Sequence, residues 1–108
     1  MNLNLPLALT TYLDAEARSD TEVLANCFAA DAVVRDEGRT IEGLAAIKAW
    51  KKSSQAKYRY TVEPLHATQD GTTVILRARV TGDFAGSPTE LTYRFALGDG
   101  KIISLEIL

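Results

Sequence analysis

Apolar and polar residues alternate through the second half of the chain, as they do in β-strands that bury one face. The alternation predicts four consecutive strands, at residues 58–69, 72–82, 90–97 and 101–108. Asp70-Gly71 and Gly98-Asp99-Gly100 are turn sequences of the kind that joins antiparallel neighbours. The residues expected on the shared apolar face are Val74, Leu76, Ala78, Val80, Leu91, Tyr93, Phe95, Leu97, Ile103, Leu105 and Ile107. We therefore expect an antiparallel meander.

Helical spacing replaces this alternation in the first half of the chain, where apolar residues recur three or four positions apart. A first helix is predicted from Asn4, as its cap, to about Arg18. Its apolar face consists of Leu5, Leu9, Tyr12 and Leu13. Ser19-Asp20-Thr21-Glu22 has the pattern of a capping box, so a short second helix begins at Asp20. Its apolar stripe consists of Val23, Leu24, Cys27 and Phe28.

Two short extended pieces and a third helix complete the first half. Residues 32–36 and 39–41 are predicted to be extended and joined by a turn at Glu37-Gly38. The third helix is predicted at residues 43–55, with Leu44, Ile47 and Trp50 on its apolar side. Lys48, Lys51 and Lys52 are expected toward its other side.

Helices followed by a meander predict the α+β class, with the N-terminal helices packed in the concave face of a curved, mostly antiparallel sheet. At 108 residues we expect one domain. A sheet curled around helices leaves an apolar cavity at its wider end, which is the expected binding site. The residues expected to border that cavity are Tyr12, Asp36, Trp50, Leu76, Ala78, Leu91, Tyr93, Phe95 and Leu105.

Composition excludes several classes of function. A net charge of −2 gives no electrostatic reason to expect binding to nucleic acid or to a membrane surface. The single cysteine, Cys27, forms no internal disulfide, and with one histidine, His66, the usual zinc ligands are missing. A glycine-rich phosphate loop and a nucleophile triad are also absent from the sequence, so we expect no metal and no cofactor. Residues 1–9 lack the basic flank of a secretion signal, and we expect a cytoplasmic protein.

Two side chains are candidates for chemistry. Asp36 ends an extended piece beside a turn, where a carboxylate reaches the mouth of a cavity as a general base. The spacing alone favours the alternative, an ordinary turn residue, because aspartate is common in turns for its own hydrogen bonding. Tyr12 brings a hydroxyl to the buried face of the first helix, where it donates either to a ligand oxygen or to a backbone carbonyl. The residues alone leave both alternatives open.

The opposite face of the meander is polar and ordered. Arg77, Arg79 and Arg94 alternate away from the apolar face, where they can pair with Glu90 and Glu106 on neighbouring strands. Such a face is typical of a solvated surface or of a dimer interface.

Several segments resemble the nuclear-transport-factor-2-like superfamily, most closely its SnoaL-like and ketosteroid-isomerase-like branches. The segments are Tyr12-Leu13-Asp14-Ala15, Phe28-Ala29-Ala30-Asp31-Ala32-Val33, Thr40-Ile41-Glu42-Gly43-Leu44 and Gly100-Lys101-Ile102-Ile103. The resemblance implies a cone-shaped fold, a homodimer through the sheet and a pocket for a small hydrophobic molecule. Asp36 falls at the position of the isomerases' proton-transferring carboxylate, and Tyr12 at that of their oxyanion-hole tyrosine. Their second donor, a protonated aspartate, is replaced by Leu91 or Thr92.

The resemblance thus implies an isomerase or cyclase that removes a proton next to a carbonyl, with Asp36 as the base and Tyr12 as the oxyanion donor. In the alternative, the chain is a binding or dimerisation module without chemistry. The remaining cavity residues (Trp50, Leu76, Ala78, Leu91, Tyr93, Phe95 and Leu105) are the expected ligand contacts in either case.

Overall fold

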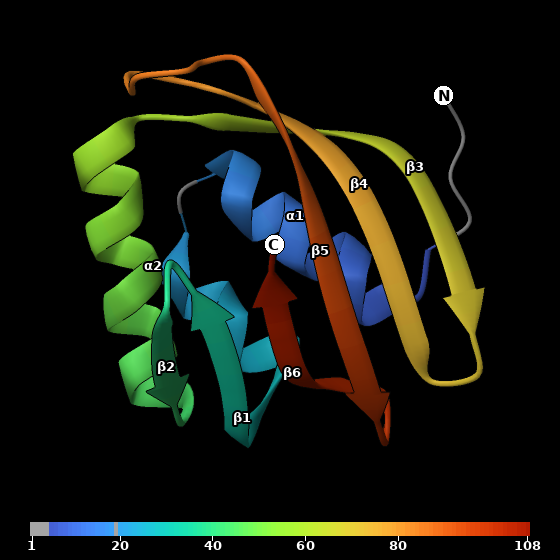
Figure 1. Ribbon diagram of the computed structural model, residues 1–108. Coiled ribbons are helices and arrows are strands. Elements are labelled where there is room, and N and C mark those ends of the chain that lie inside the picture. Colours follow the sequence, from blue (N-terminus) through green and yellow to red (C-terminus); the bar gives the residue numbers. More distant parts are fainter. Residues whose placement is uncertain (1–4, 19) are drawn as a thin grey trace.

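Helices pack against a curved sheet in the computed structural model, which describes residues 5–18 and 20–108 (Figure 1). The helices are α1 (Leu7–Arg18), the 3₁₀ helix η1 (Thr21–Asn26) and α2 (Leu44–Tyr58). The strands are β1 (Phe28–Asp36), β2 (Arg39–Glu42), β3 (Thr61–Asp70), β4 (Thr73–Thr81), β5 (Thr89–Gly98) and β6 (Lys101–Ile107). The predicted α+β class is confirmed. The predicted caps Asn4 and Ser19 lie outside the described residues.

The sheet has the strand order β2-β1-β6-β5-β4-β3. The four C-terminal strands are neighbours in chain order and antiparallel, so the predicted meander is confirmed. Strand β1 pairs in parallel with β6 and antiparallel with β2, which brings the end of the chain to the middle of the sheet.

Burial follows the predicted alternation on β4 and β5. Leu76 lies opposite Tyr93, and Phe95 lies opposite Leu105, and all four are buried. On β6 the prediction fails at Ile103, which is 44% exposed while its neighbour Ile102 is fully buried. The cause is a shift in the β5–β6 register between Ala96 and Leu97, which reverses the faces of the residues beyond it.

Predicted element boundaries were wrong around Arg59 and around Cys27, and β1 begins at Phe28 rather than at residue 32. The third helix extends through Tyr58, and its end is closed by Arg59 in the left-handed conformation, so β3 starts at Thr61 rather than at Tyr58. Cys27 and Phe28 were predicted on a helical stripe, but η1 ends at Asn26. Cys27 caps the end of η1 and β1 begins at Phe28, where the Ile102 amide ties the chain to β6 by donating to the Cys27 carbonyl at 2.7 Å. Both side chains are nevertheless buried.

The two α-helices cover different parts of the sheet. Helix α1 contacts β3 and β6, and its Tyr12 ring packs edge-on against Phe28 and Phe95 at 5.9 and 5.5 Å. Helix α2 contacts β1 and β2. Its N-cap is Gly43, whose φ of 89° favours glycine and whose amide donates to the Ala32 carbonyl. The β4–β5 loop arcs toward the C-terminal end of α2 (Figure 1). Within the described residues, no helix has the length and apolar character needed to cross a membrane.

Candidate functional site

A pocket of about 500 Å³ lies between α2, the β4–β5 loop and the ends of several strands. Its lining residues are Asp36, Glu37, Trp50, Lys51, Ser54, Tyr60, Val80, Phe84, Ala85, Gly86, Thr89, Leu91 and Ile107. The volume is in the range of small-molecule sites, and an apolar lining with a few polar groups is typical of them. The polar groups fall into two sets, one around Asp36 and one around Lys51.

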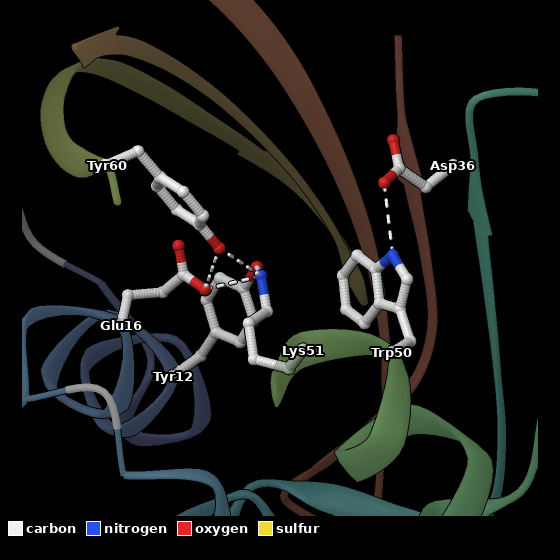
Figure 2. A network of polar contacts seen from close by, with 6 residues as sticks. All are labelled: Tyr12, Glu16, Asp36, Trp50, Lys51 and Tyr60. Carbon is white, nitrogen blue, oxygen red and sulfur yellow. Dashed lines mark hydrogen bonds and ion pairs between the residues drawn. The ribbon is translucent and has the colours of Figure 1, made fainter. Parts of the chain in front are cut away.

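Asp36 is the last residue of β1 and is partly buried. The strand ends there because Glu37 and Gly38, with φ of 52° and 74°, turn the chain back into β2. The Trp50 indole N–H donates to Asp36 Oδ2 at 3.1 Å (Figure 2). Within residues 5–18 and 20–108, the other carboxylate oxygen has no hydrogen-bond partner. Asp36 is therefore held by one donor at the pocket wall and keeps one oxygen for other contacts.

Lys51 is the centre of a buried polar network (Figure 2). Its side chain is 4% exposed, and Nζ donates to the hydroxyls of Tyr12 and Tyr60, each at 3.1 Å. Nζ also forms an ion pair with Glu16 Oε1, and the Tyr60 hydroxyl donates to the same oxygen at 3.1 Å. Because an ammonium has three donors, Lys51 is fully paired. The network joins α1, α2 and the residue before β3.

Burial sets the protonation state of the tyrosine hydroxyls in this network. Loss of solvent raises the pKa of the Tyr12 and Tyr60 hydroxyls well above the ordinary value, and the nearby charge of Glu16 raises the pKa further. Both hydroxyls are therefore protonated at neutral pH. Glu16 is 5% exposed, and its Oε2 has no hydrogen-bond partner among the described residues.

The two polar sets meet at Trp50. Lys51 Nζ lies 4.2 Å from the centre of the Trp50 ring, within the range of a cation–π contact. The edge of the same indole donates to Asp36. Consecutive residues of α2 therefore hold the carboxylate and the ammonium at different parts of one pocket wall.

The structure brings together only some of the residues predicted for the site. Asp36, Trp50 and Leu91 line the pocket. Tyr12, Leu76, Ala78, Tyr93, Phe95 and Leu105 are buried in the core and are not among the residues that line it. Tyr12 instead accepts from Lys51, which does line it. The catalytic roles of Asp36 and Tyr12, and the ligand contacts, stay predictions.

Lys51, Glu16 and Tyr60 were not predicted as site residues, and the prediction that Lys51 lies on the outer side of its helix was wrong, because its side chain is buried. A signal was present. Leu44, Ile47 and Lys51 follow the spacing of one helical face, as do Leu9, Tyr12 and Glu16. Opposite charges on the apolar stripes of two helices indicate a buried ion pair, since a lone charge is costly to bury.

This arrangement can bind a small apolar molecule and offer it one carboxylate oxygen and a polar wall. In the described part of the chain, no group of three histidine, cysteine, aspartate or glutamate side chains gathers to hold a metal.

Comparison with known proteins identifies close relatives of this fold. The sequence model of the SnoaL-like domain matches residues 9–105. The structure of a proposed polyketide cyclase from Sinorhizobium meliloti is 44% identical, with a TM-score of 0.94, and the match covers 96% of this chain and 95% of that one. No curated protein matches the chain.

More distant structures share the fold. A protein with a ketosteroid isomerase-like fold from Catenulispora acidiphila, solved with trimethylamine, is 24% identical with a TM-score of 0.85, over 97% of this chain and 86% of that one. A proposed SnoaL-like polyketide cyclase from Jannaschia sp. is 18% identical with a TM-score of 0.75, over 100% of this chain and 90% of that one.

Proposed function

The chain belongs to the SnoaL-like domain family, and we propose that it binds a small, largely apolar carbonyl compound and moves a proton beside the carbonyl. The observation that carries this proposal is the Asp36 carboxylate at the wall of an apolar pocket of about 500 Å³, held by the single Trp50 donor. A base so placed keeps an oxygen for the substrate, while its donor fixes its orientation.

In the proposed step, Asp36 Oδ1 takes a proton from the carbon next to the carbonyl. The C–H electron pair moves into the new C–C double bond and the carbonyl π pair onto oxygen, which becomes an enolate. When the enolate is conjugated with a C=C bond, return of the proton from Asp36 to the far carbon of that bond isomerises the compound. Attack of the enolate carbon on a second carbonyl of the same compound closes a ring, and the resulting alkoxide takes the proton back from Asp36. The developing negative oxygen is assigned to the polar wall at Lys51 and Tyr60; the predicted donor Tyr12 does not line the pocket and contacts this wall through Lys51.

Two findings support a cyclase or isomerase over other chemistry. The relative from Sinorhizobium meliloti, 44% identical over nearly the whole chain, is described as a proposed polyketide cyclase. The pocket itself combines an apolar body with polar groups at two places, which fits a ring compound that has one reactive carbonyl.

A second candidate is a binding module without chemistry, and one observation favours it. Each donor of Lys51 is already paired, and the Tyr60 hydroxyl donates to Glu16. The network is therefore satisfied without a ligand. In this account Trp50 holds Asp36 merely as part of the pocket wall.

Hydrogen exchange separates the two candidates. Small cyclic ketones and 1,3-diketones are incubated with the protein in D₂O, and deuterium uptake at the carbon next to the carbonyl is followed by NMR. Binding is followed by the fluorescence of Trp50, the only tryptophan of the sequence. Deuterium uptake that occurs with the wild-type protein and is lost with Asp36→Asn supports an enzyme. Binding with no uptake by the wild-type protein would leave the binding module.

We also propose that two copies associate through the outer face of the sheet. That face has the cross-strand pairs Arg77–Glu90, Arg79–Glu63 and Arg94–Glu106, with the exposed Ile103 nearby on β6. Ordered cross-strand charges together with an exposed apolar side chain support a two-fold interface, in which the same patch faces itself.

A further inference from the structure

We propose that the pocket is electrically polarised, with Lys51 and Tyr60 as a subsite for an anionic oxygen, and that Lys51 determines which ligands it accepts. The ligand class is an enolate, or a phenolate that resembles one. This inference rests on the proposed function, because it assigns the carbonyl end of the same substrate.

The buried ion pair has a direction relative to the pocket. Lys51 and Tyr60 line the pocket, whereas Glu16 and Tyr12 do not. The pair is neutral as a whole, but its cation belongs to a residue that lines the pocket, and its anion belongs to one that does not. A fixed dipole in a poorly hydrated wall attracts negative charge more strongly than the same groups would in water.

Negative charge lies on another part of the same pocket wall. Asp36 and Glu37 are the carboxylates among its lining residues, and the Trp50 indole lies between Asp36 and Lys51 (Figure 2). A carbonyl compound is therefore oriented by the pocket, with its acidic C–H toward Asp36 and its oxygen toward Lys51. The orientation is the one that proton transfer requires.

Tyr60 gives this subsite a donor. Its hydroxyl now donates to Glu16 Oε1 and accepts from Lys51. Rotation of the hydroxyl hydrogen alone lets it donate to a ligand oxygen, while Glu16 Oε1 keeps the ion pair with Lys51. Burial raises the pKa of this hydroxyl, so it stays protonated and available at neutral and mildly alkaline pH.

The test compares two probes of similar shape, 4-nitrophenol at a pH where it is ionised and the neutral 4-nitrotoluene. Binding is measured by Trp50 fluorescence and by the absorbance of the phenolate. We expect Lys51→Met to weaken phenolate binding by about 10- to 100-fold and to leave nitrotoluene binding nearly unchanged. Lys48→Met removes the same charge one turn earlier on α2, outside the pocket lining, and serves as the matched control.

A substitution at Glu16 should have the opposite effect on phenolate binding. Glu16→Gln removes the counterion and keeps the shape, so it should strengthen phenolate binding while Lys51→Met weakens it. Tyr60→Phe removes the proposed donor with little change in packing, and it should weaken phenolate binding by about tenfold even if the charge variants do not fold.

Two results overturn the inference: absence of saturable phenolate binding by the wild-type protein, and equal phenolate binding by the wild-type, Lys51→Met and Tyr60→Phe proteins. Deuterium uptake by the ketone, measured on the same variants, shows separately whether the proposed proton transfer fails. Exchange that depends on Asp36 with no effect of Lys51 or Tyr60 removes this inference alone. Phenolate binding that follows the charges, without exchange, supports this inference and removes the proton transfer.

Discussion

Gly82 lies directly against Tyr60, and the contact leaves no room for a side chain at Gly82. A Cβ atom there would lie 2.7 Å from Tyr60 Cβ and 2.8 Å from Tyr60 Cα. The Gly82 amide also donates to Ser87 Oγ at 2.9 Å, which ties the end of β4 to the β4–β5 loop. The glycine therefore fixes the position of a tyrosine that lines the pocket.

Gly82→Ala should displace the Tyr60 backbone, because the nearest atoms belong to the Tyr60 backbone and its Cβ, which cannot yield as the end of a flexible side chain does. We expect a loss of about 1–3 kcal/mol in the free energy of unfolding, together with weaker phenolate binding. Urea unfolding and Trp50 fluorescence measure the two effects. Thr81→Ala, at an exposed neighbouring position, is the control. An unchanged unfolding midpoint for Gly82→Ala would show that the segment adapts freely.

The buried pair of Glu16 and Lys51 predicts strongly non-additive stability. Lys51→Met alone leaves an uncompensated carboxylate in the core and should cost about 3–5 kcal/mol. Adding Glu16→Met removes that charge, so the double variant should recover most of the loss. Urea unfolding of the wild-type protein, both single variants and the double variant measures the coupling. Additive effects of the two substitutions would contradict a direct ion pair.

Stability should fall in alkaline solution. Burial raises the pKa of the Cys27 thiol from 9.0 to about 11, and it raises the pKa of the Tyr12, Tyr60 and Tyr93 hydroxyls as well. These groups keep their protons in the folded chain at a pH where the unfolded chain has lost them. Since the unfolded state then binds fewer protons, the free energy of unfolding decreases as pH rises above about 9.

The thiol contribution has its own window. It is complete below pH 9 and disappears as pH rises from 9 to about 11, so Cys27→Ala should flatten that part of the curve. Tyr60→Phe should flatten the part at higher pH. Urea unfolding at a series of alkaline pH values gives both slopes. A free energy of unfolding that rises over this range would contradict the burial of these groups.

Association through the outer sheet face predicts a dimer in solution. Light scattering at micromolar concentration should give twice the mass of the chain. Arg94→Glu places a like charge opposite Glu106 and should shift the mass toward the monomer. Arg18→Glu, on α1 and away from the sheet face, should leave the dimer intact. A monomer for the wild-type protein would exclude this interface.

The fold could be predicted further than the site because period-two alternation depends on neighbours in sequence. Leu76, Tyr93 and Leu105 were placed on the buried face by alternation, and they lie there. Ile103 was placed on the same face but is exposed, because a register shift leaves no trace in the pattern of one strand. The start of β3 was missed since Tyr58 favours a strand by composition, while the helix continues until Arg59 closes it.

The polar network was missed for a different reason. Charged residues are expected on the solvent side, and that expectation outweighed the spacing that places Lys51 after Ile47 and Glu16 after Tyr12. Each charge is buried because the other is present, and a pairing between two helices is not a property of either segment. Tyr60 bonds to both Lys51 and Glu16 from the turn after α2. A turn has no periodic pattern, so the sequence did not indicate where this side chain lies.

Deuterium uptake by a bound cyclic ketone tests most directly whether Asp36 transfers a proton in the pocket. The rate is measured by NMR at a saturating concentration of a ketone whose binding Trp50 fluorescence has established. We predict that Asp36→Asn, which keeps the size and the contact with Trp50, lowers the rate by about 100-fold or more. Asp31→Asn, an exposed carboxylate of the same strand, is the control and should leave the rate unchanged. Equal rates for the wild-type and Asp36→Asn proteins would contradict the account.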